Sequence, residues 1–521
     1  MVSFLGHLGF RETFNSTLTF TIMLIAVSQF NFGFDQQGFN TTQAMSAFAK
    51  HYGWLNPKTK EYYLESWWLS LFTGLPYIGF GIGIILGSMV SNRWGRRMCM
   101  FTMSVWSLIA TTIIMTANNR DHLLAGRILA YIYIGMELAV VPIFQSEITP
   151  EKARGFIVGT YQLSLGVGGL VVNGIARATG DLNSPAAFRI IYGLFYLVPA
   201  TVACGIWFVP ESPRWLAMKG CQEEALASLT RFRKNKFSET EINDEMAKIN
   251  YGITREVEKG TFMEMFQNKQ TTKRTLVVIF TNFFLQTTGS LFASVYGAYF
   301  TKQLAFINPF TITVSNSALQ IVACILAMLM VDKLGRRNVI FIGGSIQTAG
   351  LFVMGGLGLV TNPNVAIKSA IVAMMVVMTF GFTIGWAPVS HIISAEVPSM
   401  RLRDITYRTA SIVNIATQFA VTFSMPYLLN APYAALGSKV GLIFGSMCIS
   451  SLVFVFFCVP ECKGRKLEDI DLLFESKVPL RHFGRVRIDD ALRERYVKPV
   501  DQGNDEDVSK AGMAVQVEHS A

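Results

Sequence analysis

The sequence predicts an all-α membrane protein with twelve transmembrane helices in two six-helix bundles, on three observations. Hydrophobic residues make up 51% of the 521 residues and charged residues only 15%, which is more apolar sequence than a soluble domain buries. The apolar residues gather in segments long enough to cross a bilayer. Charged motifs at the ends of these segments recur at a nearly constant offset, which indicates two copies of one unit.

Twelve apolar segments can be counted, and each is long enough to span. They cover approximately residues 17–38, 67–90, 98–117, 122–145, 156–175, 187–209, 276–300, 310–331, 339–360, 366–393, 405–429 and 437–459. The fifth is rich in Gly and Ser, as is common where membrane helices approach closely. The predicted organisation is a cytosolic N-terminus at 1–16, bundles at 17–209 and 276–459, a cytosolic linker at 210–275 and a cytosolic tail at 460–521.

Basic residues set the orientation. They cluster after the second, sixth and eighth segments, and the opposite loops carry far fewer. The positive-inside rule therefore places both termini and the linker in the cytosol. Within the linker, helical apolar spacing predicts helices over 223–234 and 239–249.

Several function classes are excluded. The net charge of +10 comes from Lys and Arg placed between apolar segments, so no nucleic-acid partner is expected. Seven cysteines are present, mostly in or beside apolar segments, and they suggest no disulfide or zinc framework. There is no P-loop lysine, metal-ligand cluster or catalytic triad. We therefore expect no enzyme, no metal and no cofactor.

Three charged motifs recur between the halves. NRWGRR at 92–97 returns as DKLGRR at 332–337, Glu147 returns as Glu396, and Pro210-Glu211 returns as Pro460-Glu461, at offsets of 240, 249 and 250. Such motifs at cytosolic helix ends predict an Arg–carboxylate network that latches the halves together in one state. A purely topogenic role is the alternative. The residues expected in the latch are Arg93, Arg96, Arg97, Glu147, Arg154, Glu211, Arg214, Asp332, Arg336, Arg337, Glu396 and Arg403.

Charged residues inside apolar segments include Asp35, Arg127 and Glu137. Arg127 needs a carboxylate or a wet cavity, because a guanidinium in hydrocarbon is costly. Asp35 is the candidate partner: it lies near the outer end of an in-to-out helix, and Arg127 lies near the outer start of an out-to-in helix. Glu137, at mid-span, is open to three interpretations: a second proton site, a substrate contact, or a bond to a neighbouring helix.

The motifs together resemble the sugar porter family of the major facilitator superfamily, and most of all its fungal members. The matching runs are FGFD at 32–35, NRWGRR, GR at 126–127, PIFQSEITPEKARG at 142–155, PESPRWL at 210–216, DKLGRR and PECKGRKLEDID at 460–471. The resemblance implies the major facilitator fold and secondary transport. It also implies that Asp35 and Arg127 serve proton coupling, as the matching pair does in that family.

The resemblance further points to the substrate site. Gln162, Gln286 and Asn414 match the family's sugar-binding amides, and Gln320 falls where another amide is frequent. All four lie at mid-depth in their segments, where uncharged groups can bond hydroxyls. His391 stands where the family usually has a tryptophan, although Trp386 lies nearby, so both are candidate substrate contacts.

Departures from the family pattern leave the substrate open. Leu285 and Leu291 replace an amide pair usual in the seventh helix, which leaves room for a disaccharide, quinate or a less polar metabolite. The run AEVPSMRLRD at 395–404 is similar to fungal α-glucoside and lactose-type permeases and favours a glycoside.

The expected function is proton-coupled uptake of a hexose, disaccharide or α-glucoside by alternating access. The expected partners are that sugar or glycoside, protons and the lipid bilayer, with the protein acting as a monomer in the plasma membrane. One alternative is transport of quinate, another polyol-like compound or a secondary metabolite. The other is a transporter-like nutrient sensor, for which the tail of about 60 residues from Pro460 is modest.

Overall fold

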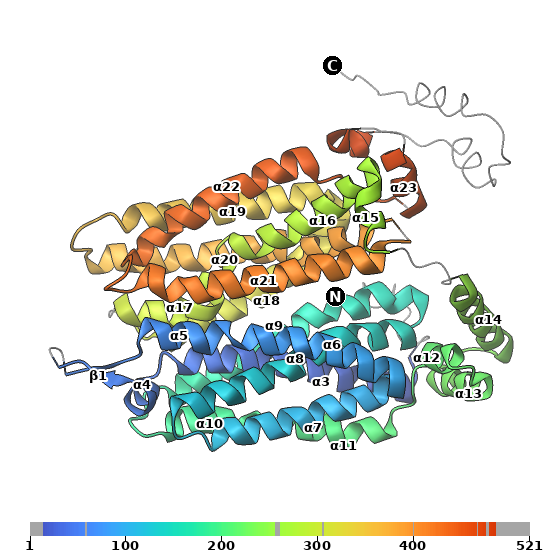
Figure 1. The fold of residues 1–521 in the computed structure, drawn as a ribbon, viewed down its shortest axis with the longest axis horizontal. Coiled ribbons are helices and arrows are strands. Elements are labelled where there is room, and N and C mark those ends of the chain that lie inside the picture. Colours follow the sequence, from blue (N-terminus) through green and yellow to red (C-terminus); the bar gives the residue numbers. More distant parts are fainter. Residues whose placement is uncertain are drawn as a thin grey trace. The chain divides into compact units, whose positions relative to one another are not determined.

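The structure, a computed structural model, describes residues 14–57, 60–255, 261–304, 307–399, 401–465, 467–475 and 479–485. Helices dominate it (Figure 1). In the described chain one small sheet is present, in which β1 (Trp54–Leu55) pairs antiparallel with β2 (Tyr62–Tyr63) beside the short helix α4 (Ser46–Tyr52). The sequence predicted none of these three short elements, which lie between the first two spans.

The first half contains six spans. They are α3 (Ser16–Thr42), α5 with α6 (Ser66–Gly74, Pro76–Trp94), α7 (Arg96–Met115), α8 (Arg120–Ile148), α9 (Glu151–Thr179) and α10 with α11 (Ala186–Leu194, Leu197–Gly205). Polar caps fix the two helices that carry the buried charges. The side chain of Asn15 accepts from the Leu18 amide at 2.8 Å to begin α3, and Asn119 accepts from the His122 amide at 3.1 Å to begin α8.

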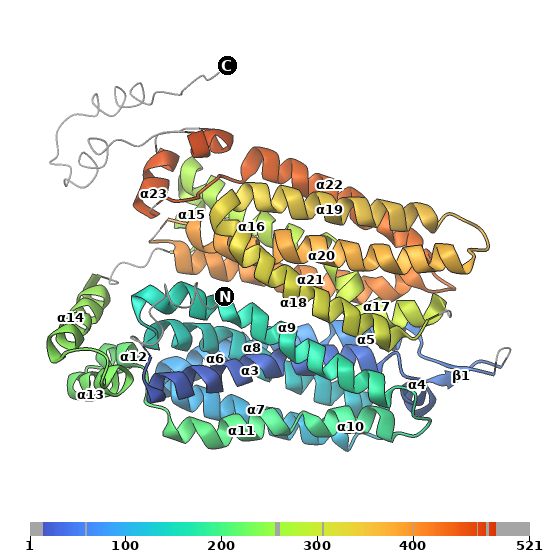
Figure 2. The same cartoon turned by 180° about the vertical axis from the view of Figure 1, so that it is seen from behind.

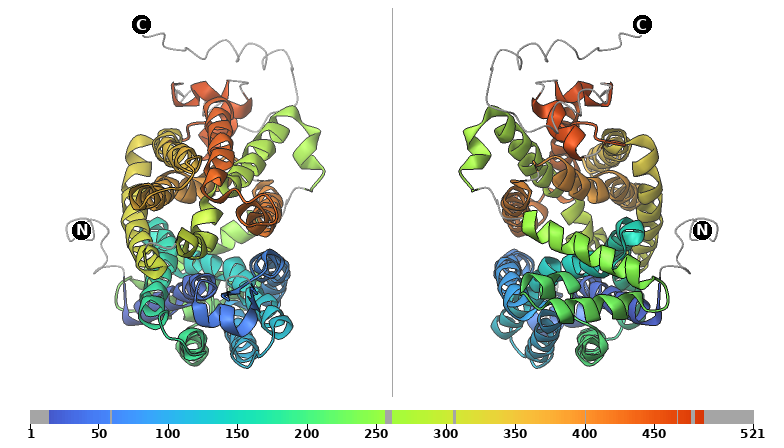
Figure 3. Two further views of the ribbon diagram at one scale, coloured as in Figure 1. Left: turned by 90° about the vertical axis from the view of Figure 1, so that its left-hand side faces the viewer. Right: turned by 90° about the vertical axis from the view of Figure 1, so that its right-hand side faces the viewer.

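The linker folds into helices beside the ends of α6 and α8 (Figures 1 and 3). These are α12 (Pro213–Met218), α13 (Gln222–Arg233) and α14 (Glu239–Arg255), which confirms both predicted linker helices. They share a small apolar core. Arg233 is completely buried, pairs with Glu245 at 2.7 Å and donates to the Ile148 carbonyl at 3.0 Å. This arginine ties the linker to the end of α8.

The second half repeats the pattern after the short helix α15 (Glu264–Gln267). Its long helices are α16 with α17 (Lys269–Thr287, Ser290–Leu304), α18 (Pro309–Leu334), α19 (Arg336–Leu357), α20 (Val365–Glu396), α21 (Arg403–Leu429) and α22 (Val440–Cys458), and α23 (Leu467–Glu475) follows. Figures 1 and 2 show α19 lying alongside α20 and α22.

All twelve predicted segments are helical. Among the described residues, eleven stretches are long and apolar enough to span a membrane, and α9 is the twelfth long helix. It packs along α3 at very short range: a Cβ added to Gly33 would lie 2.0 Å from the Leu165 carbonyl oxygen, and one added to Gly168 would lie 2.1 Å from that of Phe30. The glycines of the fifth segment therefore serve close helix approach, as predicted.

The internal contacts of the chain also define two compact units. Unit 1 comprises Met1–Val257, Leu291–Ile321 and Gln418–Gly437, and unit 2 comprises Glu258–Ser290, Val322–Thr417 and Ser438–Ala521. Parts of α17, α18 and α21 thus belong with the first half. Within unit 1, the Thr73 and Tyr296 hydroxyls lie 2.5 Å apart, and Asn173 donates to the Ser317 hydroxyl at 2.8 Å.

Candidate functional site

Asp35 on α3 and Arg127 on α8 form the ion pair predicted from their depths. Nη1 of Arg127 lies 2.8 Å from Oδ1 of Asp35, and the two residues are 1% and 3% exposed. They adjoin an apolar cluster that includes Phe34, Phe39 and Ala130. The pair is therefore fully withdrawn from water in this conformation.

Two aromatic rings act on the charge of Arg127 in addition to its hydrogen bond to Asp35. The guanidinium carbon lies 3.8 Å from the centre of the Phe39 ring and 5.0 Å from that of Tyr131, which are cation–π distances. Its Nε is buried and has no hydrogen-bond partner among the described residues. Because the attraction of Asp35 is the main compensation for this buried charge, protonation of the carboxylate would loosen the guanidinium.

Three amides form a bonded row in unit 2. Nε2 of Gln286 on α16 donates to Oδ1 of Asn414 on α21 at 3.2 Å, and Nδ2 of Asn414 donates to Oδ1 of Asn282 at 3.3 Å. Asn282 in turn donates to the Ser394 hydroxyl of α20 at 2.9 Å. Sequence reasoning found Gln286 and Asn414 but missed Asn282 and Ser394, although Asn282 lies one turn before Gln286.

The helix that carries Gln286 is broken just after it. Gly289 separates α16 from α17 with φ of +89°, and an added Cβ would lie 2.9 Å from Cβ of Phe444. The break frees the Thr288 carbonyl, which accepts from Nε2 of Gln347 at 2.8 Å and from Sγ of Cys448 at 3.3 Å. Interrupted membrane helices of this kind occur where the backbone borders a binding cavity.

The other predicted substrate residues have different environments. Gln162 on α9 is exposed and Gln320 on α18 is half-buried, both in unit 1. His391 on α20 is exposed, one turn before Ser394. A Cβ on Gly166, one turn after Gln162, would lie 3.3 Å from the Ile321 side chain.

Trp386 is 0% exposed and belongs to the hydrophobic core of unit 2. It lies beside a close crossing of α19 and α20, in which a Cβ on Gly343 would lie 2.6 Å from Cα of Gly385. Its indole nitrogen is buried and has no hydrogen-bond partner among the described residues. Its role as a substrate contact stays a prediction.

The predicted Arg–carboxylate networks are formed, and each lies inside one unit. In unit 1, Nε and Nη2 of Arg96 donate to the two oxygens of Glu147 at 2.9 and 2.8 Å. Glu211 accepts from the backbone amides of Arg96, Arg97 and Ser212 at 2.8 to 3.1 Å. Burial raises the pKa of Glu211, and these amide bonds act against the rise.

Unit 2 repeats the arrangement. Nε and Nη2 of Arg336 donate to Glu396 at 3.1 and 2.7 Å, and Glu461 accepts from the backbone amides of Arg336 and Arg337 at 3.0 Å each. Gly335 makes room for this carboxylate, since an added Cβ would lie 2.6 Å from its oxygen and the φ of the glycine is +88°. Gly95 does the same for Glu211, with a corresponding distance of 2.2 Å and φ of +96°.

These bonds join α7 to α8 and α19 to α20, so they brace each half internally. The latch between the halves stays a prediction. Of its other proposed members, Arg93 is exposed beside Trp94, Arg214 and Arg403 are half-buried, and Arg97 also donates to the Trp207 carbonyl at 3.1 Å. The side chains of Arg154 and Asp332 lie outside the described residues.

Glu137 is a buried acid without a hydrogen-bond partner in the described part of the chain. It is 0% exposed on α8, and neither carboxyl oxygen meets a hydrogen-bond donor or acceptor among the described residues. Of its three interpretations, a bond to a neighbouring helix is not formed here.

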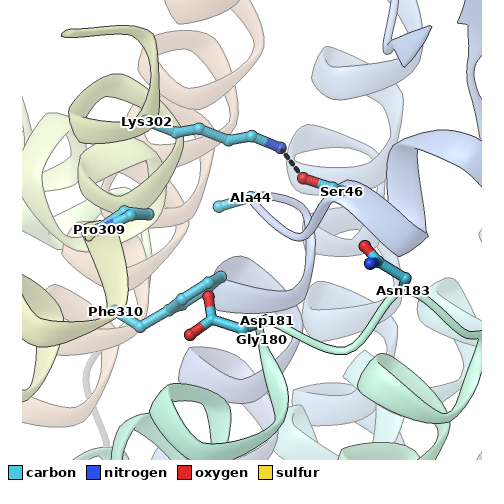
Figure 4. Close-up of a pocket in the computed structure, with 8 residues that line it drawn as sticks. All are labelled: Ala44, Ser46, Gly180, Asp181, Asn183, Lys302, Pro309 and Phe310. Atoms are coloured by element: carbon cyan, nitrogen blue, oxygen red, sulfur yellow. Dashed lines mark hydrogen bonds between the residues drawn. The ribbon is translucent and has the colours of Figure 1, made fainter. Parts of the chain in front are cut away.

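One pocket lies apart from the predicted residues. The pocket shown in Figure 4 is lined by Asp181, Asn183 and Phe310, together with Ser46 and Lys302. Nζ of Lys302 donates to the Ser46 hydroxyl at 3.3 Å. Asp181 is already paired with Arg177 at 3.0 Å. No residue predicted for the functional site lines this pocket.

Long apolar helices that enclose an ion pair, with bonded amides inside the second half, are the features of a multi-pass membrane transporter. The fold is that of the major facilitator superfamily. A solved structure of its proton:xylose symporter XylE, from E. coli, has a TM-score of 0.69 and 21% sequence identity, over 88% of this chain and 99% of that one. The chain belongs to the sugar (and other) transporter family, whose model matches residues 21–474.

Two fungal relatives extend the comparison. The high glucose sensor RGT2 of Saccharomyces cerevisiae is 26% identical over 463 residues, which cover 87% of this chain but 60% of that protein. The high-affinity glucose transporter ght2 of Schizosaccharomyces pombe is 27% identical over 503 residues, 94% of this chain and 93% of that protein.

Proposed function

We propose that the protein takes up a sugar, a hexose or a disaccharide such as an α-glucoside, together with protons. The Asp35–Arg127 pair carries this proposal. A facilitator needs no titratable group in its core, and a buried carboxylate that holds a buried guanidinium is costly to keep for structure alone. The named activities of ght2 and XylE support sugar and proton as the cargo pair.

The coupling follows from the charge arrangement. We infer that Asp35 is ionised in the described conformation, because it accepts a hydrogen bond from Arg127 at 2.8 Å. A proton that enters from outside neutralises Asp35, which weakens the bond and changes the relative energies of the end states. Accumulation of sugar follows because the proton gradient then biases the transport cycle.

We further propose that the amide row binds the sugar. Asn282, Gln286 and Asn414 offer several donors and acceptors that bond to one another at 3.2 to 3.3 Å. These bonds are long for hydrogen bonds between neutral amides, so little free energy is lost when sugar hydroxyls replace them. The amide donors and acceptors then give the site its specificity for hydroxyl groups. Gln162 and Gln320 in unit 1, and His391 in unit 2, are proposed as further contacts.

Replacing Gln286, Asn414 or Gln162 by Ala is expected to weaken apparent affinity about 2- to 13-fold each, because one neutral hydrogen bond is worth roughly 0.5 to 1.5 kcal/mol. The half-saturation constant for uptake measures this effect. Thr417→Ala is the control on α21, since the Thr417 hydroxyl bonds the carbonyl of its own helix at 2.7 Å. Unchanged half-saturation in all three variants would place the sugar elsewhere.

The internal networks give a second prediction. Arg96→Ala and Arg336→Ala are each expected to slow turnover roughly tenfold, because each variant loses two charge-assisted bonds between an arginine and a carboxylate. Surface abundance should stay near that of the wild type. Arg231→Ala, at an exposed arginine on α13, is the matched control. Wild-type turnover in both variants would contradict a role in the transport cycle.

We propose that the protein acts as a monomer in the plasma membrane with both termini in the cytosol. A second candidate function is nutrient sensing, which the similarity to RGT2 favours. Transport of quinate, another polyol-like compound or a secondary metabolite is the remaining alternative, in keeping with Leu285 and Leu291 in the seventh span.

One experiment separates these functions. Labelled hexoses, maltose, lactose and quinate are supplied to cells that lack their own sugar transporters, at two external pH values. Symport predicts that a sugar is accumulated and that this accumulation increases as external pH falls. Quinate uptake without sugar uptake favours the polyol alternative, and absence of uptake with normal surface abundance favours the sensor.

A further inference from the structure

Glu137 is a completely buried acid that the proposed cycle has not yet used. An ionised carboxylate without hydrogen bonds would be extremely costly at this site, so the side chain carries a proton. Among the described residues, no hydrogen bond reaches either of its carboxyl oxygens. The titratable side chain that interacts with it is Tyr133, one turn earlier on α8. Arg127 lies ten residues away, about 15 Å along the helix.

Further buried polar atoms connect this region with Asp35. Ser28, Asn31 and Asp35 are spaced by three and four residues, so they share one face of α3. Oγ of Ser28 and Oδ1 of Asn31 are buried without a hydrogen-bond partner among the described residues. The Tyr133 hydroxyl reaches the Ser28 carbonyl at 3.4 Å. This contact brings the face of α8 that carries Glu137 next to Ser28, which is the end of the Asp35–Asn31–Ser28 series nearer the cytosol.

We propose that Glu137 is a second proton site, closer to the cytosol, which exchanges one proton with Asp35 along the row formed by Asn31, Ser28 and Tyr133. The inference rests on the proton-coupled transport proposed above. In the exchange a proton leaves a carboxyl oxygen of Asp35 and adds to a carboxylate oxygen of Glu137, so the total charge is unchanged. Buried polar atoms of this kind commonly bind ordered water, which carries protons across gaps between side chains.

The described conformation corresponds to one side of this exchange. Asp35 is ionised and paired with Arg127 at 2.8 Å, and Glu137 is neutral in its apolar site. In the reverse state Asp35 holds a proton taken up from outside, and Glu137 is ionised because it has released its own proton toward the cytosol. The total charge of Arg127, Asp35 and Glu137 is zero in both states.

Infrared difference spectroscopy tests the proton on Glu137 without any substrate. Wild-type protein and Glu137→Gln are compared in lipid nanodiscs at neutral pH. The difference between these two spectra is expected to contain the carbonyl stretch of one protonated carboxyl group. The spectrum of Asp35→Asn should contain the same band. Absence of the band would overturn the proposal.

Uptake in proteoliposomes tests the exchange, with labelled D-glucose or the sugar that the panel identifies. Glu137→Gln is expected to lower uptake driven by a proton gradient at least tenfold and to keep sugar counterflow. Asn31→Leu should slow uptake driven by a proton gradient and leave sugar counterflow unchanged. Ser104→Ala, a buried hydroxyl on α7 that bonds the Met100 carbonyl at 2.8 Å, should change neither rate.

The outcomes separate this inference from the proposed function. Driven uptake that survives in Glu137→Gln but not in Asp35→Asn would overturn the second site and leave symport in place. A wild type that shows no proton-driven uptake would overturn symport and the exchange together. Size-exclusion profiles of the variants distinguish loss of coupling from misfolding. If Glu137→Gln does not fold, Asn31→Leu provides the test. Wild-type proton-driven uptake in Asn31→Leu would then overturn the exchange.

Discussion

Asp35→Asn is expected to abolish accumulation of sugar against a gradient while labelled sugar still exchanges across the membrane. Asparagine has the size of aspartate but neither binds nor releases a proton, so the link between the proton gradient and the end states is lost. The measurements are concentrative uptake in cells and counterflow in proteoliposomes.

The control for this variant is Asp121→Asn. Asp121 lies in the first turn of α8, six residues before Arg127, but it is exposed. It should leave both activities unchanged. Concentrative uptake that persists in Asp35→Asn would refute the assignment of Asp35 as the proton-coupling residue.

Gly289→Ala is expected to lower both stability and transport strongly. Alanine at φ of +89° is strained, and its Cβ would lie 2.9 Å from Cβ of Phe444. Strain of about 1–2 kcal/mol and overpacking of about 1–3 kcal/mol add to roughly 2–5 kcal/mol. The variant should unfold at a lower temperature and turn over at least tenfold more slowly, because the α16–α17 break beside Gln286 must rearrange.

Thermal unfolding of purified protein and uptake per molecule check this result. Gly356→Ala is the matched control, since an added Cβ there would meet nothing within 4 Å. A Gly289→Ala variant with wild-type unfolding temperature and turnover would show that the break tolerates a side chain.

The fold was predictable because twelve apolar lengths and a charged repeat are strong signals. Helix ends were less so. The first segment was expected to end at Gly38, but α3 continues to Thr42. Its last residues are polar and buried, with the Thr41 hydroxyl donating to Asn173 at 2.7 Å. These partners come from distant helices, so a hydropathy pattern does not reveal them.

The site was predictable where depth alone decides the contact. Asp35 and Arg127 were matched by their positions along two antiparallel helices, and they do pair. The complete burial of Trp386 was not predictable, because α20 is apolar on nearly every side and its sequence does not show which face turns inward. Asn282 was overlooked because an asparagine in an apolar helix has no distinctive spacing.

The unit boundaries were not predictable for a further reason. The inclusion of Leu291–Ile321 in unit 1 depends on contacts such as Thr73 with Tyr296. Thr73 and Tyr296 are 223 residues apart in the sequence. A hydropathy pattern indicates each helix but not which distant helix its end contacts.

The bracing of each half by its own charges bears on how the protein is made. Asp35 meets Arg127, and Arg96 meets Glu147, all within residues that leave the ribosome before the second half is synthesised. The nascent first half therefore neutralises these costly side chains as it enters the bilayer, without waiting for its sister bundle. Membrane insertion of the two halves can then proceed in two successive stages. In a variant such as Glu147→Ala, the Arg96 guanidinium would lack this carboxylate while the first half inserts, and cellular quality control could recognise the protein early in synthesis.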